Sequence, residues 1–196
     1  MRPFIAVMLL SVLVAAQDSA DRKKDTQHRS PAASSDLASQ VPAPRAEDVK
    51  SRDALLAAIY DVISGPAGDR DWDRFRSLFL AQAVLVALHK KPDGSITVRT
   101  LSVDDYIAGA GAYFKKNAFY ERPIANRVQS FGNMAEIFSS YESRNAPGER
   151  PFERGINSIQ MVNDGKRWWA VSIVWDEERP DNPLPAGFTA GSPDRQ

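Results

Sequence analysis

The second half of the chain consists of strand-like segments, and this feature constrains the possible folds more than any other. Apolar residues alternate or cluster in four runs, which predict strands over residues 120–131, 134–144, 155–162 and 167–176. The last two runs are joined by residues 163–166, with the sequence NDGK. An Asp-Gly pair between apolar strands is typical of a tight hairpin turn, because such a turn needs a positive φ. The pattern therefore predicts an antiparallel sheet.

Helical periodicity appears before this sheet. Apolar residues at steps of three and four predict helices over residues 52–64, 72–80 and 102–116. Two strands, over 83–88 and 96–101, are expected between the second and third helices. The resulting order is α-α-β-β-α-β-β-β-β. Helices that come early and an antiparallel sheet that comes late indicate an α+β fold rather than a doubly wound parallel fold.

Five segments in this order carry a resemblance to a known superfamily. They are residues 55–63, 72–79 (WDRFRSLF), 79–85 (FLAQAVL), 102–107 (SVDDYI) and 165–171 (GKRWWAV). With them, the chain resembles the nuclear transport factor 2-like (NTF2-like) superfamily, which includes polyketide-cyclase-like, or SnoaL-like, and ketosteroid-isomerase-like proteins. The resemblance implies a curved mixed or antiparallel sheet wrapped around three N-terminal helices, a cone with a pocket at its open end.

The resemblance covers residues 52–176 and leaves the chemistry open. It aligns Ala87 with the aspartate base of steroid isomerases and Ile59 with their tyrosine. Alanine cannot move a proton, so these departures argue against steroid-isomerase chemistry. The same fold carries enzymes and non-catalytic binding proteins, so the fold alone does not choose between them.

The N-terminus has the pattern of a secretory signal peptide over residues 1–16. Arg2 gives a positive start, Phe4–Val14 is apolar, and Ala15 and Ala16 provide the small side chains of a cleavage site. The apolar run is too short to cross a hydrocarbon core of about 30 Å, so we expect no stable membrane insertion after its removal. Without cysteine the chain cannot be a lipoprotein. We therefore expect a secreted or periplasmic protein.

Three further boundaries follow from composition. Residues 17–50 are rich in Ser, Ala, Pro and charged residues and predict a disordered tether. The folded domain is expected over 51–176. Residues 177–196 form a Pro-rich tail that either lies along the domain surface through Leu184 and Phe188 or is loose.

The composition also excludes several classes of chemistry. The chain has no cysteine and only 2 histidines, so thiolate catalysis, an iron–sulfur cluster and a multi-histidine metal site are excluded. The 25 basic and 25 acidic residues balance, which argues against a nucleic-acid-binding protein. We expect no cofactor and no metal.

No residue pattern identifies a catalytic site, but three residues are candidates. His89 follows the aligned Ala87 by two positions and either points into the mouth of the cone as a general base or is a rim histidine beside two lysines. Tyr106 and Asp176 form a possible second pair. Six residues are candidates for binding a ligand: Tyr60, Tyr106, Tyr141, Asn157, Trp169 and Trp175.

The last strand suggests a partner surface. Strand alternation puts Trp169 and Trp175 on one face, and Trp168 and Val174 on the other. Because both faces are apolar, both should be covered, and the face with Trp168 is expected either to form a homodimer or to lie beneath the tails.

Three functions remain open from the sequence. The first is an exported domain that binds a small, partly apolar molecule. The second is an enzyme of the same fold, an isomerase, dehydratase or hydrolase. The third is a dimerising protein-interaction module.

Overall fold

The structure, a computed structural model, describes residues 38–189, all of which belong to one compact unit. The predicted signal peptide, residues 17–37 of the predicted tether and residues 190–196 of the tail lie outside the described residues. The helices and strands are α2 (Ala46–Val49), α3 (Arg52–Ile63), α4 (Trp72–Ser77), β1 (Phe79–Lys90), β2 (Ile96–Leu101), α5 (Val103–Phe114), β3 (Tyr120–Phe131), β4 (Met134–Arg144), β5 (Glu153–Asn163) and β6 (Trp168–Glu177). The α+β prediction is confirmed.

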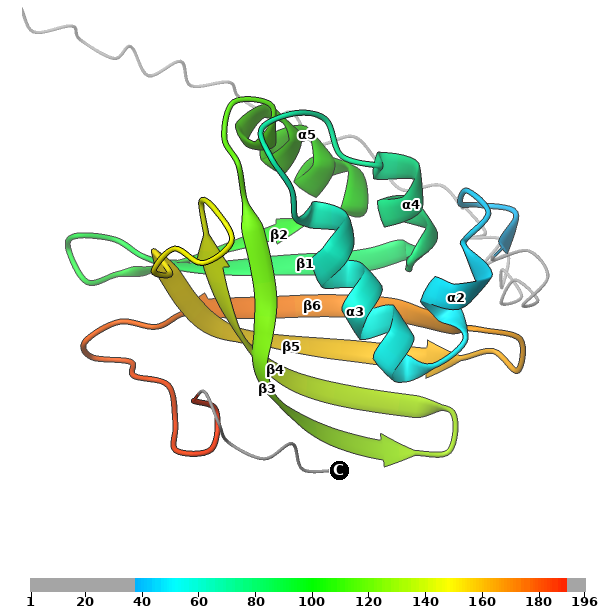
Figure 1. The fold of residues 1–196 in the computed structure, drawn as a ribbon. Helices are drawn as coiled ribbons and strands as arrows, with labels where there is room; N and C mark the ends of the chain where they lie inside the picture. The colour runs from blue at the N-terminus through cyan, green and yellow to red at the C-terminus, as the bar shows by residue number, and fades with distance from the viewer. Residues whose placement is uncertain (1–37, 190–196) are drawn as a thin grey trace, which may run out of the picture. The chain divides into compact units, whose positions relative to one another are not determined.

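The strands form one sheet in the order β2-β1-β6-β5-β4-β3. β1 and β6 pair in parallel, and all other neighbours pair antiparallel, so the sheet is mixed. Figure 1 shows α3, α4 and α5 against one face of the sheet, which curves around them. We call this the inner face and the opposite one the outer face. The architecture matches the cone expected from the sequence.

The helices begin where the sequence provides caps for their free backbone N–H groups. The side chain of Ser51 accepts from Ala54 at the start of α3, and that of Asp71 accepts from Arg74 at the start of α4. Ser102 opens α5 with a reciprocal capping box. Side-chain caps of this kind contribute about 1 kcal/mol each.

Apolar side chains of the inner face and the helices form the core. The inner face of the sheet contributes Leu85, Ile137 and Ile159, and the helices contribute Leu55 and Phe75. All five side chains are buried. Burying one such side chain stabilises the fold by about 1.5–3 kcal/mol. The core therefore fixes the helices over the concave side of the sheet, which is where the site lies.

Two predicted boundaries are wrong. The predicted tether contains α2, whose Asp48 and Val49 are buried, so the folded domain begins before residue 51. Two charged hydrogen bonds of 2.7 and 2.9 Å join Asp48 to Arg74 of α4 and hold α2 in place. The second helix ends at Ser77 rather than at residue 80, because Phe79 already pairs with β6.

The C-terminal tail lies along the outer face as far as it is described. Leu184 contributes to a groove with Phe138 of β4, and Phe188 packs against the same phenylalanine. Arg127 of β3 donates to the carbonyl oxygen of Gly187 at 2.6 Å. Of the two arrangements that the sequence left open, residues 178–189 adopt the surface-bound one. Across residues 38–189, no helix has the length and apolar character needed to span a membrane.

Candidate functional site

A cavity of about 160 Å³ lies between the helices and the inner face of the sheet. Two helices and two strands give it an apolar wall, made of Ile59, Ile63, Phe75, Leu85, Ile173 and Trp175. Its polar side comes from strands β3, β4 and β5, with Tyr106 of α5 beside it: Glu121, Tyr141, Glu153 and Asn157. The cavity therefore combines a large apolar wall with a few polar groups, as small-molecule sites do.

Two hydroxyl groups hold the two carboxylates of this cavity in position. The Ser143 hydroxyl donates to Oε2 of Glu121 at 2.9 Å. The Tyr141 hydroxyl donates to Oε1 of Glu153 at 2.9 Å. Each carboxylate therefore has one oxygen fixed by a donor from β4, the strand that lies between β3 and β5.

A second polar network fixes Asn157. Its amide nitrogen donates to the Tyr60 hydroxyl at 3.1 Å, and that hydroxyl is 2.7 Å from the hydroxyl of Ser139. Tyr60 and Ser139 are buried. Because buried polar groups are costly unless they are hydrogen-bonded, this network specifies a single orientation for Asn157 at the cavity.

Burial changes the protonation of both carboxyl groups. It raises the pKa of Glu121 to about 7, with a smaller contribution from the charge of Glu153, while hydrogen bonds from Ser143 and Asn157 act in the opposite direction. Burial also raises the pKa of Glu153, and the nearby Glu177 adds to this effect. Glu121 is therefore about half ionised at neutral pH.

The tyrosines around the cavity are held neutral. Burial raises the pKa of Tyr60 and of Tyr106, and the charge of Glu121 raises both further. Burial also raises the pKa of Tyr141, next to the charges of Glu153 and Glu121. These hydroxyls are thus hydrogen-bond donors at any ordinary pH rather than bases.

Comparison with known proteins identifies the fold. No family model matches the sequence, and no curated protein matches it. Among solved structures, a Novosphingobium aromaticivorans protein described as the beta subunit of an aromatic-ring-hydroxylating dioxygenase has a TM-score of 0.50 and 14% identity, over 66% of this chain and 88% of its own. An NTF2-like protein of unknown function from Silicibacter pomeroyi has a TM-score of 0.45 and 16% identity, over 64% and 92%. A Shewanella frigidimarina protein described as a ketosteroid isomerase has 0.42 and 11%, over 62% and 91%.

The fold is NTF2-like. The structural neighbours include proteins described as NTF2-like, cystatin-like and ketosteroid isomerase, and the helices packed on a curved mixed sheet are the architecture that the sequence resemblance implied. At these identities the likeness concerns the fold alone, so the function has to be argued from the site.

The NTF2-like fold brings four of the predicted ligand-binding residues into one cavity. Tyr106, Tyr141, Asn157 and Trp175 are all part of its lining. Tyr60 lies behind Asn157, to which it is hydrogen-bonded. The periodicity of β4 and β5 assigns Tyr141 and Asn157 to strand faces but does not show which face is concave.

The predicted place of Trp169 is wrong. Trp169 pairs with Val162 on the outer face, whereas Ile173 and Trp175 face the cavity. An irregularity in the β5–β6 pairing, between Met161↔Ala170 and Gln160↔Ser172, explains the difference. Such a bulge inserts an extra residue and inverts the alternation beyond it. Trp169 is fully buried, its ring covered by the guanidinium of Arg167 at 3.6 Å.

The same irregularity corrects the predicted partner surface. Trp168 lies on the inner side of the sheet and packs against the core, so it does not share a face with Val174. The exposed apolar residues of the outer face instead include Val174 and residues of four other strands. They are Val84, Ile96, Val98, Phe131, Met134 and Phe138.

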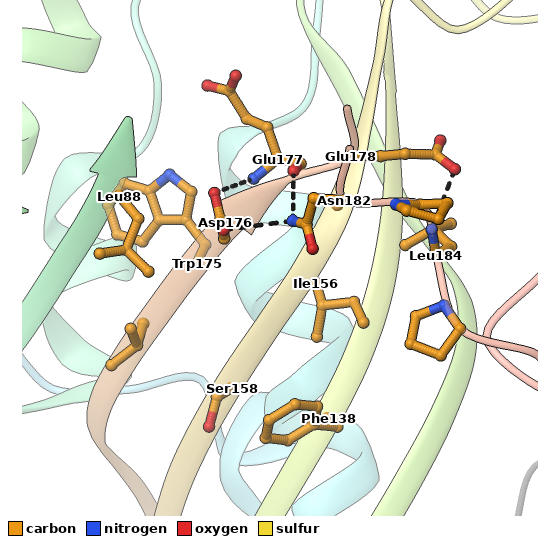
Figure 2. Close-up of a pocket in the computed structure, with 14 residues that line it drawn as sticks. Leu88, Phe138, Ile156, Ser158, Trp175, Asp176, Glu177, Glu178, Asn182 and Leu184 are labelled. Atoms are coloured by element: carbon orange, nitrogen blue, oxygen red, sulfur yellow. Dashed lines mark hydrogen bonds between the residues drawn. The ribbon is translucent and has the colours of Figure 1, made fainter. Parts of the chain in front are cut away.

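The outer face also carries a groove of about 260 Å³ under the C-terminal tail. Figure 2 shows its floor of Phe138 and Ile156, with Asp176 at one side. Two hydrogen bonds of 2.5 and 3.0 Å join Asp176 to Arg179, and they hold the pKa of Asp176 below its usual range. The polar groups of this groove thus hold the tail rather than a ligand.

The structure does not bring the three catalytic candidates together. Asp176 lies in the outer groove, while Tyr106 lines the inner cavity on the other side of the sheet. His89 has a side chain that is 64% exposed, and its Nδ1 is 3.9 Å from Glu177. It therefore lies at the rim, and it is not part of the cavity lining among the described residues.

Two residues of the site were missed by the sequence reasoning, Glu121 and Glu153. The alternation that groups Asn157 with Ile159 extends back to Glu153, so this signal was available. For Glu121 it was misleading, because the β3–β4 pairing is irregular between Pro123 and Ala125 and the alternation inverts there. In the part of the chain that the structure describes, no group of three or more His, Cys, Asp or Glu residues is placed to hold a metal ion.

Proposed function

We propose that this NTF2-like protein binds a small, partly apolar molecule in the inner cavity. The observation that carries this proposal is the cavity itself, in which an apolar wall faces two carboxyl groups. Its volume of about 160 Å³ is close to that of an apolar protein cavity of roughly 150 Å³ that binds benzene. A molecule with about one ring and one polar group therefore fits.

The carboxyl groups support a functional rather than a structural role for the cavity. Glu121 and Glu153 repel each other, and burial disfavours their charged forms. Such an arrangement costs stability, and groups of this kind cluster at functional sites. A cavity that only filled space would be more stable with apolar side chains there.

Native mass spectrometry of the full chain tests this proposal. We expect a retained or added small molecule to appear as a defined extra mass. Ile173→Phe narrows the cavity and should abolish the added mass, whereas Val174→Phe changes the next residue on the opposite face and should leave it. Retention of the ligand by both variants would place binding elsewhere, and a protein that takes up no small apolar molecule at all would overturn the proposal.

A second candidate function is an enzyme of the same fold, an isomerase, dehydratase or hydrolase. Glu121 favours it, because a carboxyl group with a pKa of about 7 can both accept and donate a proton at neutral pH. The neutral Tyr106 and Tyr141 supply hydrogen-bond donors on the same cavity. A chemically changed ligand recovered from the wild type, and an unchanged one from Glu121→Gln, would separate an enzyme from a binding protein.

The outer face supports a third proposal, a homodimer. Val98 of β2 is 62% exposed, and Val84, Phe138 and Val174 extend the same apolar surface across the sheet. Exposed apolar patches of this kind mark interaction sites. Residues 178–189 of the C-terminal tail cover the part of this surface near Phe138.

The N-terminal sequence supports the proposal that the protein is exported. If residues 1–16 are removed as the signal pattern predicts, the secreted or periplasmic product begins at Gln17. The intact mass of protein recovered outside the cytoplasm tests this directly, and an unprocessed chain there would contradict it.

A further inference from the structure

The carboxylates of this domain that are shielded from water fall into two groups, which differ in whether an arginine pairs with them. Several buried or half-buried carboxylates are paired with arginine. The pairs are Asp48 with Arg74 at 2.7 Å, Glu142 with Arg144 at 2.6 Å, Glu178 with Arg154 at 2.7 Å, and Asp176 with Arg179 at 2.5 Å. This is the usual solution, because a desolvated charge is costly unless an opposite charge compensates it.

Glu121 and Glu153 are the exception. Neither forms an ion pair with any residue in the described range 38–189, and their hydrogen-bond donors there are neutral groups, including the hydroxyls of Ser143 and Tyr141. The described residues that line the cavity include no Lys, Arg or His. The cavity therefore offers two carboxyl groups and no basic side chain.

We infer that the ligand of this cavity is a small primary amine, bound as its ammonium ion by Glu121 and Glu153. This inference rests on the proposed function and names the chemical class of its ligand. The ammonium ion supplies the positive charge that arginine supplies to the other carboxylates. A carboxylate or phosphate ligand is disfavoured, because it would add a third negative charge.

The geometry of the polar groups suits an ammonium ion. The strand order places β4 between β3 and β5, and the register pairs Glu121 and Glu153 with Ser143 from its two sides. Asn157 uses its amide nitrogen for Tyr60, which leaves its carbonyl oxygen as an acceptor. Two carboxylates and one carbonyl oxygen match the three N–H donors of a primary ammonium group.

The apolar wall sets the size of the rest of the ligand. Phe75, Ile173 and Trp175 surround the remaining space, which is part of a total of about 160 Å³. A single ring or a short branched chain fills such a space. Benzylamine is therefore a suitable probe, with benzyl alcohol, toluene and benzoate as matched compounds that differ in the polar group only.

The inference predicts a dependence on pH as well. Four titratable groups face Glu121: Tyr60 from α3, Tyr106 from α5, Tyr141 from β4 and Glu153 from β5. The tyrosines stay neutral, so ionisation of Glu121 changes the charge of the cavity between pH 6 and pH 8. If the ionised form binds the amine, the affinity should rise about tenfold over this interval.

Isothermal titration calorimetry of the full chain with the four probes tests the inference. We expect benzylamine to bind most tightly and benzoate least. Glu121→Gln and Glu153→Gln should each lower the affinity for benzylamine by about tenfold or more, as expected for the loss of a charged hydrogen bond. Neither should change the affinity for benzyl alcohol by more than about twofold, and circular dichroism checks that each variant is folded. Both substitutions keep the shape of the side chain. If one variant does not fold, the other still tests the inference.

The outcomes separate this inference from the proposed function. Binding of toluene and benzyl alcohol with an affinity equal to or above that of benzylamine would overturn the amine inference and leave the binding cavity intact. Unchanged benzylamine affinity in both glutamine variants would also overturn it. If none of the four probes binds, and Ile173→Phe retains whatever mass the wild type carries, the proposed function itself fails.

Discussion

Replacing Glu121 by glutamine should make the protein more stable at neutral and alkaline pH. The substitution keeps the shape of the side chain and removes its charge. In the folded protein the pKa of this carboxyl is about 7, against an ordinary value of 4.5. Folding therefore favours the protonated form, and the ionised form lowers the stability of the folded state.

The size of the effect follows from this difference. One pKa unit corresponds to about 1.4 kcal/mol, so the full shift corresponds to about 3 kcal/mol. Glu121 is only half-buried, and water screens part of its charge, so we expect about 2 kcal/mol.

The sign depends on pH in a defined way. Below pH 4.5 the carboxyl is protonated in both the folded and the unfolded chain, and its contribution is constant. As the pH rises towards 7, unfolding releases a proton, so the free energy of unfolding of the wild type decreases. The free energy of unfolding of the glutamine variant lacks this decrease, so the stability of the variant relative to the wild type should increase between pH 5 and pH 8.

Urea denaturation of both proteins at pH 5, 6, 7 and 8, followed by tryptophan fluorescence, measures this difference. Glu142→Gln is a control of opposite sign, because burial raises the pKa of Glu142 but Arg122 and Arg144 more than offset this and hold it below its usual range. That variant should be less stable than the wild type at pH 7, and the gap should close as the pH falls towards 4. A difference between Glu121→Gln and wild type that stays constant from pH 5 to pH 8 would refute the reasoning.

Three further predictions concern packing, the N-terminal boundary and assembly. A methyl group on Gly155 would lie 2.7 Å from the Tyr141 hydroxyl and would also meet a backbone carbonyl of β6, so Gly155→Ala should destabilise the protein by about 1–3 kcal/mol. Gly109 lies in open space within α5, so Gly109→Ala should instead stabilise it by up to about 1 kcal/mol. Equal shifts in the melting temperatures of the two variants would contradict this. Asp48→Ala removes one of the two carboxylates that pair with Arg74 of α4 and should cost about 2–3 kcal/mol in chemical denaturation, whereas no loss would mean that α2 does not support the domain. For the homodimer, light scattering after size exclusion should give a dimer for the wild type and a monomer for Val98→Glu; a monomeric wild type, or a dimeric variant, would refute the proposed surface.

The elements of the fold could be predicted from the sequence because their signals are local. The helix expected over residues 52–64 is α3, and the strands expected over 120–131 and 134–144 are β3 and β4 with the same bounds. Periodicity and turn residues act over a few positions, so a single sequence contains them. The Asp-Gly hairpin is an example, since Gly165 has a φ of +88° and Asp164 accepts from two backbone N–H groups of the turn.

The candidate site could be predicted only in part, because its members come from three helices and five strands. Tyr141 and Asn157 were found because β4 and β5 keep strict alternation through the residues concerned. Trp169 was misplaced, and Glu121 was missed, because each lies beyond an irregularity in strand pairing. A bulge depends on how two strands pair, so the sequence of either strand alone does not predict it.

The sequence by itself determined the order of helices and strands, the α+β class and the apolar character of the last strand, since these follow from local periodicity. Only the tertiary structure decided which face of the sheet is concave, that α2 belongs to the domain through Asp48 and Arg74, and that two carboxyl groups share one cavity without a basic partner. The physical reason is that charge pairing and burial are set by contacts between residues far apart in the chain. Glu121 and Glu153 acquire their chemistry from this placement and not from their neighbours in sequence.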